Sequence, residues 1–136
     1  MIKTIKLMLS LVLLLTSVVW AEVQEIDNAR LQELLAQKVP IIDIRRAEEW
    51  TQTGIVEGSH LLTFFDAAGN YDARAWLAQL EPIAGKEDPF ILICRTGRRT
   101  GLISQFLDKQ IGYKNVYNVT KGITHWIDQK NPIVTP

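Results

Sequence analysis

Hydrophobic residues along the chain fall into two patterns. Short runs rich in apolar and β-branched residues predict buried strands. Three such runs occupy residues 41–44, 90–93 and 116–119, and weaker ones lie at 22–26 and 59–62. The run Phe90-Ile91-Leu92-Ile93 is apolar at every position, which is typical of a strand covered on both faces of a parallel sheet.

Between these runs, apolar residues recur three and four positions apart, as on one face of a helix. Asp27 is the predicted N-cap of the first helix, and Gly54 and Gly112 are predicted to end two others. Helical segments are expected after Asp27, at 46–53, at 73–80, from about Thr100 to Gly112, and around 123–127. In the fourth of these, the predicted apolar face consists of Leu102, Ile103, Phe106 and Leu107. Strands that alternate with helices predict an α/β fold with a mostly parallel central sheet of about five strands.

The first 21 residues read MIKTIKLMLSLVLLLTSVVWA and are typical of a secretory signal peptide. Lys3 and Lys6 precede an apolar run that is shorter than the roughly 20 residues of a membrane-spanning helix. Small residues at the end of the segment predict cleavage after Ala21. We therefore expect a periplasmic protein without a stable membrane anchor, with residues 22–136 forming one domain.

Cys94 is the only cysteine of the 136 residues. In an oxidising compartment cysteines usually pair, and a single one cannot pair within its own chain. Three interpretations follow: a small buried hydrophobic residue, a reactive thiol, or the link of a disulfide-bonded dimer. Composition does not separate these three interpretations. Formal charge is balanced, and neither charge nor composition favours a nucleic-acid partner.

The residues around Cys94 favour the reactive thiol. Ligands of open α/β sheets bind beyond the carboxyl ends of the strands, and Cys94 follows the strongest predicted strand. A helix N-terminus and nearby guanidinium groups both favour a thiolate. The glycine allows backbone N–H groups to converge on one anion. The predicted anion-binding residues are Arg95, Thr96, Gly97, Arg98, Arg99 and Thr100.

Four motifs in order resemble those of a single-domain rhodanese, a sulfurtransferase. As a small, exported, one-domain protein, the chain also resembles the phage-shock type of that family. CRTGRRT at 94–100 resembles the active-site loop of that family, and GIVEGS at 54–59 resembles its glycine-rich stretch. IIDIRRAEEW at 41–50 and VYNVTKGITHW at 116–126 resemble the motifs that precede and follow them. The resemblance implies a three-layer α/β/α fold.

The resemblance also implies a mechanism in two steps. Cys94 takes a sulfane sulfur from a donor such as thiosulfate, becomes a persulfide, and passes the sulfur to a thiophilic acceptor such as cyanide or a partner protein. Arg95 or Arg98 is expected to bind the donor, with Arg99 closing the loop. Asp43 and Arg45 are expected to support the site as a buried ion pair. No cofactor is implied, and His60 and His125 lack partners at metal-binding spacing.

Two alternatives remain open. One is a periplasmic sulfur carrier or sulfide-binding module that does not turn over steadily. The other, less favoured, is a cysteine-dependent phosphatase or arsenate reductase, whose loop places arginine six positions after the cysteine. Here that position is Thr100, and the shorter loop suits a sulfur atom better than a phosphate.

Overall fold

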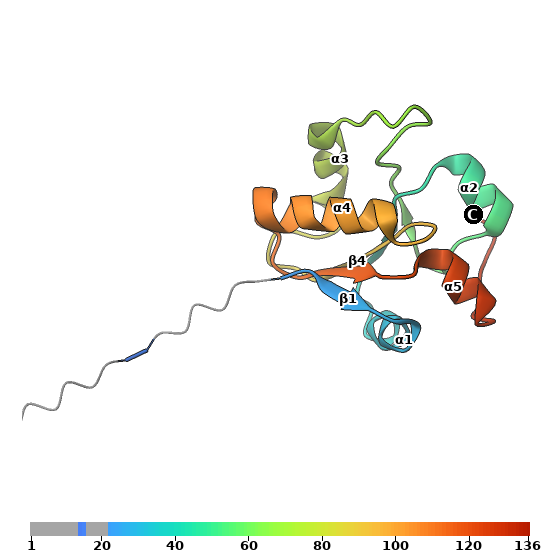
Figure 1. The fold of residues 1–136 in the computed structure, drawn as a ribbon, viewed down its shortest axis with the longest axis horizontal. Helices are drawn as coiled ribbons and strands as arrows, with labels where there is room; N and C mark the ends of the chain where they lie inside the picture. Colours follow the sequence, from blue (N-terminus) through green and yellow to red (C-terminus); the bar gives the residue numbers. More distant parts are fainter. Residues whose placement is uncertain (1–13, 16–21) are drawn as a thin grey trace, which may run out of the picture.

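The computed structural model describes residues 14–15 and 22–136, and within the latter a sheet of five parallel strands organises the fold (Figure 1). The strands are β1 (Gln24–Ile26), β2 (Ile41–Asp43), β3 (His60–Leu61), β4 (Phe90–Ile93) and β5 (Val116–Val119). Their order in the sheet is β1-β5-β4-β2-β3, so β4 is central. Every neighbouring pair is parallel. All carboxyl ends therefore meet at one edge of the sheet, where ligands of such folds bind.

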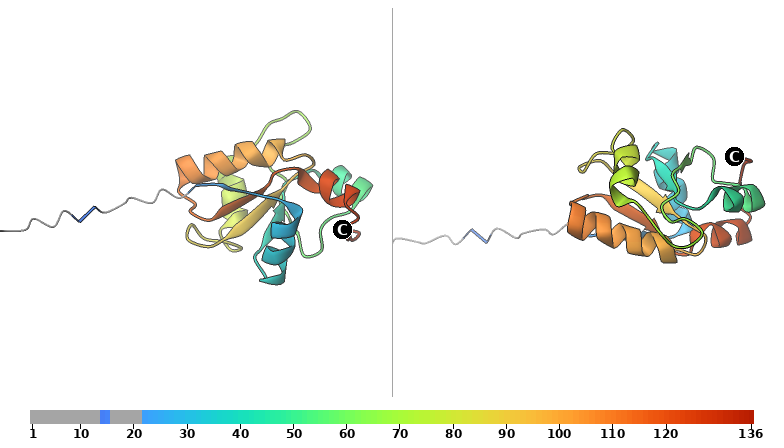
Figure 2. Two further views of the ribbon diagram at one scale, coloured as in Figure 1. Left: turned by 60° about the horizontal axis from the view of Figure 1, so that its bottom comes forward. Right: turned by 90° about the horizontal axis from the view of Figure 1, so that it is seen from above.

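Helices cover both faces of the sheet, which gives the three layers expected (Figure 2). They are α1 (Asn28–Ala36), α2 (Ala47–Thr53), α3 (Ala73–Leu80), α4 (Arg98–Phe106), a π-helical turn η1 (Leu107–Ile111), and α5 (Gly122–Asp128). Residues of α3 and α4 pack with one face of the sheet, in the cluster that contains Leu92 and Cys94. Residues of α1 and α5 pack with the other face, around Ile91 and Ile93. The alternation of β4 side chains between two apolar layers explains its unbroken hydrophobic run.

The predicted elements are confirmed except at the helix that follows Cys94. Asp27 caps α1 by accepting a hydrogen bond from the Arg30 N–H at 2.8 Å. The helix expected to begin near Thr100 begins at Arg98, because Gly97 is its N-cap with φ 91°. The Gly97 carbonyl accepts from the Gly101 N–H at 2.9 Å, so the first turn already includes the arginines.

The predicted apolar face of α4 is wrong at one position. Leu102 is 64% exposed, while Thr100 and Ser104 point inward and are fully buried. The Ser104 hydroxyl donates to the Thr100 carbonyl at 2.5 Å, so the helix itself satisfies this polar side chain. The inward face of α4 therefore contains two small polar residues that a search for apolar periodicity does not detect, and it excludes Leu102.

The leader predicted for residues 1–21 lies outside the described residues, apart from Leu14 and Leu15. Cleavage after Ala21, and the domain boundary placed there, remain predictions. Within residues 14–15 and 22–136, no helix has the length and apolar character needed to cross a membrane.

Candidate active site

Cys94 directly follows the central strand β4 and is 1% exposed. Its Sγ accepts a hydrogen bond from the Gly97 N–H at 3.2 Å and lies 3.3 Å from the Thr100 Oγ1. Gly97 caps α4, so the amino terminus of this nine-residue helix faces the sulfur. Backbone N–H groups and the positive end of a helix both stabilise negative charge. The environment of the sulfur is therefore polar on the loop side, although hydrocarbon packs against the rest of the residue.

Two glycines fix the shape of the loop that carries Cys94. Gly97 has φ +91°, and a Cβ there would collide with the carbonyl of Thr120. Gly122 has φ +65°, and a Cβ there would collide with the carbonyl of Arg95. The Cys94 loop and the turn between β5 and α5 thus touch backbone to backbone, an approach that only glycine allows.

Helix α5 orients the peptide groups of the same loop. The Ile123 N–H donates to the Cys94 carbonyl at 2.9 Å, and the Thr124 N–H donates to the Arg95 carbonyl at 3.1 Å. Because a trans peptide directs its N–H opposite to its C=O, the amides of Arg95 and Thr96 point away from α5. Their N–H groups are therefore not used by hydrogen bonds to α5.

The three arginines of the loop have different surroundings. Arg95 and Arg98 are exposed, as is Thr96. Arg99 is half-buried and forms two parallel hydrogen bonds with Glu49 of α2, at 2.8 Å from Nη1 to Oε2 and 2.6 Å from Nη2 to Oε1. The Glu49 carboxylate therefore neutralises the charge of Arg99 locally, which fits the expected role of Arg99 in closing the loop. The positive charge that remains available comes from Arg95 and Arg98.

Glu49 is the functional-site residue that the sequence analysis did not assign a role. It belongs to one of the four motifs, but its partner lies 50 positions away in the sequence. The hydrogen bond from Arg99 lowers its pKa to about 2, and the Arg46 N–H, 3.0 Å from Oε2, adds to the effect. The same contact raises the pKa of Arg99. An ionised pair therefore links α2 to the first turn of α4.

Asp43 and Arg45 form the expected buried ion pair, and both side chains are fully buried. The Arg45 Nη2 lies 2.9 Å from Asp43 Oδ2 and also donates to the Gly54 carbonyl at 3.0 Å. The Arg45 Nη1 donates to the Thr53 hydroxyl at 2.9 Å. The pair therefore joins the end of β2 to the end of α2, a supporting role that fits its complete burial.

Aromatic residues line the neighbouring connection between β3 and α3. Phe64 is 7% exposed and stacks on Tyr71, with ring centroids 5.3 Å apart. Tyr71 is 62% exposed, and Phe65 packs edge-on against both rings. Figures 1 and 2 show this connection beside the N-terminal end of α4. Phe64 is therefore a core residue, and Phe65 and Tyr71 extend its aromatic cluster toward the surface.

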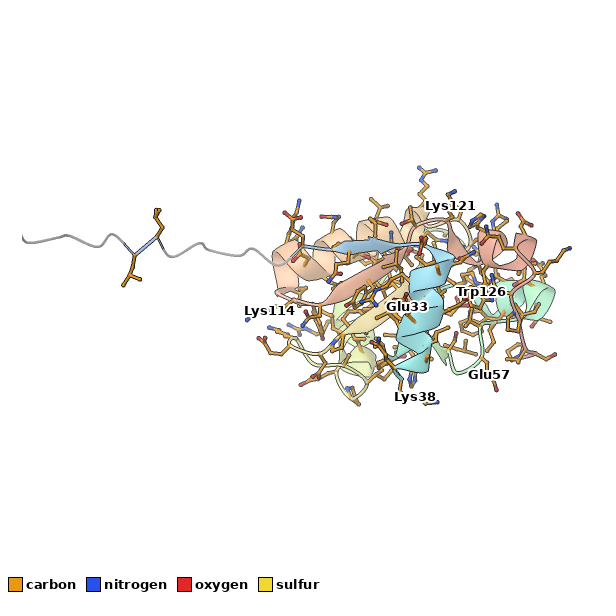
Figure 3. The ribbon with its side chains drawn as sticks, turned by 90° about the horizontal axis from the view of Figure 1, so that it is seen from below. Glu33, Lys38, Glu57, Lys114, Lys121 and Trp126 are labelled. Carbon is orange, nitrogen blue, oxygen red and sulfur yellow. The ribbon has the colours of Figure 1, made fainter. Side chains whose placement is uncertain are left out.

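Two cavities formed by the described residues lie away from the sulfur. A groove of about 810 Å³ on the side of α1 and α5 is lined in part by Lys38, Glu57 and Trp126 (Figure 3). A second cavity of about 410 Å³ includes Lys121. Neither contains Cys94, whose own loop covers the sulfur. Among the described residues, no group of three or more His, Cys, Asp or Glu could hold a metal ion.

Comparison with known proteins identifies the family. The rhodanese-like domain family matches residues 27–129. "Putative sulfurtransferase YtwF" of Bacillus subtilis (strain 168) is 28% identical over 113 residues, or 82% of this chain and 97% of that protein. Rhodanese domain-containing protein CG4456 of Drosophila melanogaster is 32% identical over 97 residues, or 68% and 85%. A crystal structure of a rhodanese-related protein from Thermoplasma volcanium superposes with a TM-score of 0.63 at 24% identity, covering 83% of this chain and 99% of that one.

The chain belongs to the rhodanese-like family, and the family match and the relative named as a putative sulfurtransferase support a sulfurtransferase-type enzyme. The superposition with the rhodanese-related structure shows the fold. The predicted fold class is therefore confirmed. The comparisons leave the sulfur donor, the acceptor and the roles of individual residues open.

The pair between Glu49 and Arg99 predicts a defined pH dependence of stability. The pKa of Glu49 falls from the ordinary 4.5 to about 2 on folding, so its stabilising effect is complete above pH 4.5 and is lost as the pH falls toward 2. We expect Glu49→Gln to lower the free energy of urea unfolding at pH 7, and the difference from wild type to shrink below pH 4.5. Glu48→Gln is the matched control, because that carboxylate is exposed and pairs only at the surface. A difference that stays constant down to pH 2.5 contradicts the assignment.

Proposed function

We propose that this protein is a sulfurtransferase that carries a sulfane sulfur as a persulfide on Cys94. The observation that carries the proposal is the position of Sγ between the Gly97 N–H, the Thr100 hydroxyl and the amino terminus of α4. These groups stabilise an anionic sulfur without a metal or a second cysteine.

Thiosulfate is the proposed donor. The Cys94 thiolate attacks the outer sulfur, the S–S bond of thiosulfate breaks, and its electron pair leaves with sulfite. The product is a Cys94 persulfide anion, which accepts hydrogen bonds from the same donors as the thiolate. Arg95 and Arg98 are the groups that attract the donor, because both are exposed beside the loop and carry charge that Glu49 does not neutralise.

A thiophilic acceptor completes the cycle. Cyanide, the assay acceptor, attacks the outer sulfur of the persulfide, thiocyanate leaves, and the Cys94 thiolate is regenerated. Because Cys94 is 1% exposed, both reactants must reach the sulfur past residues 95–98. We therefore expect small displacements of this loop or of the two exposed arginines to accompany each half-reaction.

Sulfur loading tests the proposal directly. Purified protein incubated with thiosulfate is expected to gain the mass of one sulfur atom on Cys94 and to form thiocyanate when cyanide is added. Cys94→Ser is expected to lose both properties while keeping the same melting temperature within a few degrees. Intact-mass spectrometry and a thiocyanate assay measure these outcomes. Activity that survives in Cys94→Ser refutes the mechanism, and a stable persulfide without turnover indicates a sulfur carrier instead.

Charge on the loop is tested by Arg98→Ala. We expect the KM for thiosulfate to rise about five- to tenfold, the effect of losing one charge-assisted contact, while the rate of the cyanide step changes less than twofold. Arg74→Ala is the matched control, since it removes the same charge from an exposed position on α3. Steady-state kinetics with each substrate varied separately distinguish the two steps. An unchanged KM in Arg98→Ala shows that another group binds the donor.

We also propose that the protein is exported, on the basis of the charged and apolar pattern of residues 1–21. Expression of the full sequence in a bacterial host is expected to yield a periplasmic protein that begins at Glu22. Amino-terminal sequencing of the periplasmic fraction measures this. Recovery of an uncleaved chain from the membrane fraction contradicts it.

A further inference from the structure

Residues 131–134, called the strap below, connect two helices that are distant in the sequence. At one end, Val134 and Ile55 exchange two backbone hydrogen bonds of 2.9 Å each, in an isolated antiparallel bridge. Ile55 directly follows the glycine that ends α2. The strap therefore attaches to the exit of α2 through main-chain bonds in both directions.

The other end of the strap is attached to α5. The Trp126 Nε1 donates to the Pro132 carbonyl at 2.8 Å, and the Asn131 N–H donates to the Trp126 carbonyl at 3.1 Å. Gln32 of α1 adds a hydrogen bond of 2.6 Å to the Asn131 side chain. Because Trp126 is buried at 3% exposure, these bonds fix the strap to the packed part of α5.

The strap also packs closely against the end of α2. Gly54 has φ +79°, and a Cβ there would lie 2.9 Å from the Val134 carbonyl oxygen and 3.0 Å from the Ile133 Cδ1. The carbonyl of Gly54 is an acceptor of Arg45, whose guanidinium is fully buried. The strap thus lies directly against the backbone that the buried ion pair holds.

Both helices joined by the strap hold the Cys94 loop, at its two ends. Helix α5 binds the carbonyls of Cys94 and Arg95. Helix α2 binds the first turn of α4 through Glu49 and Arg99. The loop is therefore held by both α5 and α2, and the strap connects these two helices to each other.

We propose that residues 131–134 are a positioning element of the Cys94 site, which fixes α2 relative to α5 and thereby the loop between them. The strap follows residue 129, where the match to the rhodanese-like family ends. The proposal rests on the proposed function only for its kinetic readout, because the accessibility of the thiol is measured independently of sulfur transfer.

Main-chain bonds rather than side-chain burial account for this role. Ile133 and Val134 are 41% and 37% exposed, so their side chains contribute little to the core. Val134→Pro removes the N–H that donates to the Ile55 carbonyl, whereas Val134→Ala shortens the side chain and keeps that N–H. The two variants therefore separate the bridge from the apolar contact.

The experiment measures the rate of Cys94 alkylation by iodoacetamide at one pH, together with kcat and KM for thiosulfate. In Val134→Pro we expect alkylation about fivefold faster, the order of effect of one lost hydrogen bond, because the loop that covers the sulfur opens more often. We expect KM to rise by a similar factor, since Arg95 and Arg98 move with the loop. Val134→Ala is expected to match wild type. A purely structural role lowers the folded fraction, and hence the apparent kcat, but leaves KM unchanged.

Two further variants keep the test decisive. Trp126→Phe replaces Val134→Pro as the test if the proline variant does not fold. It retains a buried ring and removes the N–H that donates to the Pro132 carbonyl. We expect it to raise the alkylation rate and KM by about twofold. Ile111→Ala loses apolar packing on the π-helical turn at the far end of α4, and it is expected to lower the melting temperature without changing alkylation. Equal alkylation rates in Val134→Pro, Trp126→Phe and wild type overturn the proposal. A different result is faster alkylation in Val134→Pro and Trp126→Phe while wild type shows no thiosulfate turnover. That result supports the role of the strap and refutes the proposed reaction.

Discussion

The contact between two glycine-containing turns is the constraint on which the site depends. Gly97 lies against the Thr120 carbonyl and Gly122 lies against the Arg95 carbonyl, so the loops after β4 and β5 meet without intervening side chains. At this separation the first amides of α5 reach the carbonyls of the Cys94 loop. Helix α5 therefore holds the loop through its carbonyl groups, and the Gly97 N–H remains free to donate to the sulfur. A parallel sheet makes this arrangement possible, because it brings the ends of neighbouring strands to one edge.

Electrostatic specialisation within the loop follows from that fixed backbone. Arg99 is turned toward Glu49, which neutralises it and converts it into a link between α2 and α4. Arg95 and Arg98 remain in contact with solvent. The three arginines of the loop thus separate into one cation that is paired within the protein and two cations that are exposed to solvent. Pairing with Glu49 also reduces the mutual repulsion of the three guanidinium groups.

The order of elements and the position of Cys94 were predictable from the sequence because both depend on local patterns. Strand β5 has the predicted bounds, and Asp27 caps α1 as expected. The start of α4 was not predictable, since its first turn carries arginines rather than apolar residues and its cap is a glycine in a left-handed conformation. The partner of Arg99 and the strap were also missed. Both join segments tens of residues apart in the sequence, and no local period records such contacts.

Enclosure of the sulfur also bears on the third interpretation of a lone cysteine, a disulfide-bonded dimer. A disulfide requires two sulfur atoms about 2.05 Å apart and Cα atoms within roughly 7 Å. Cys94 lies at the end of a central strand, under its own loop and beside the first turn of a helix. A disulfide between two copies would therefore require the loop over each Cys94 to open and lose its hydrogen bond to the sulfur. The same enclosure that limits access of small molecules to this thiol therefore also separates it from the surface that a second copy would contact.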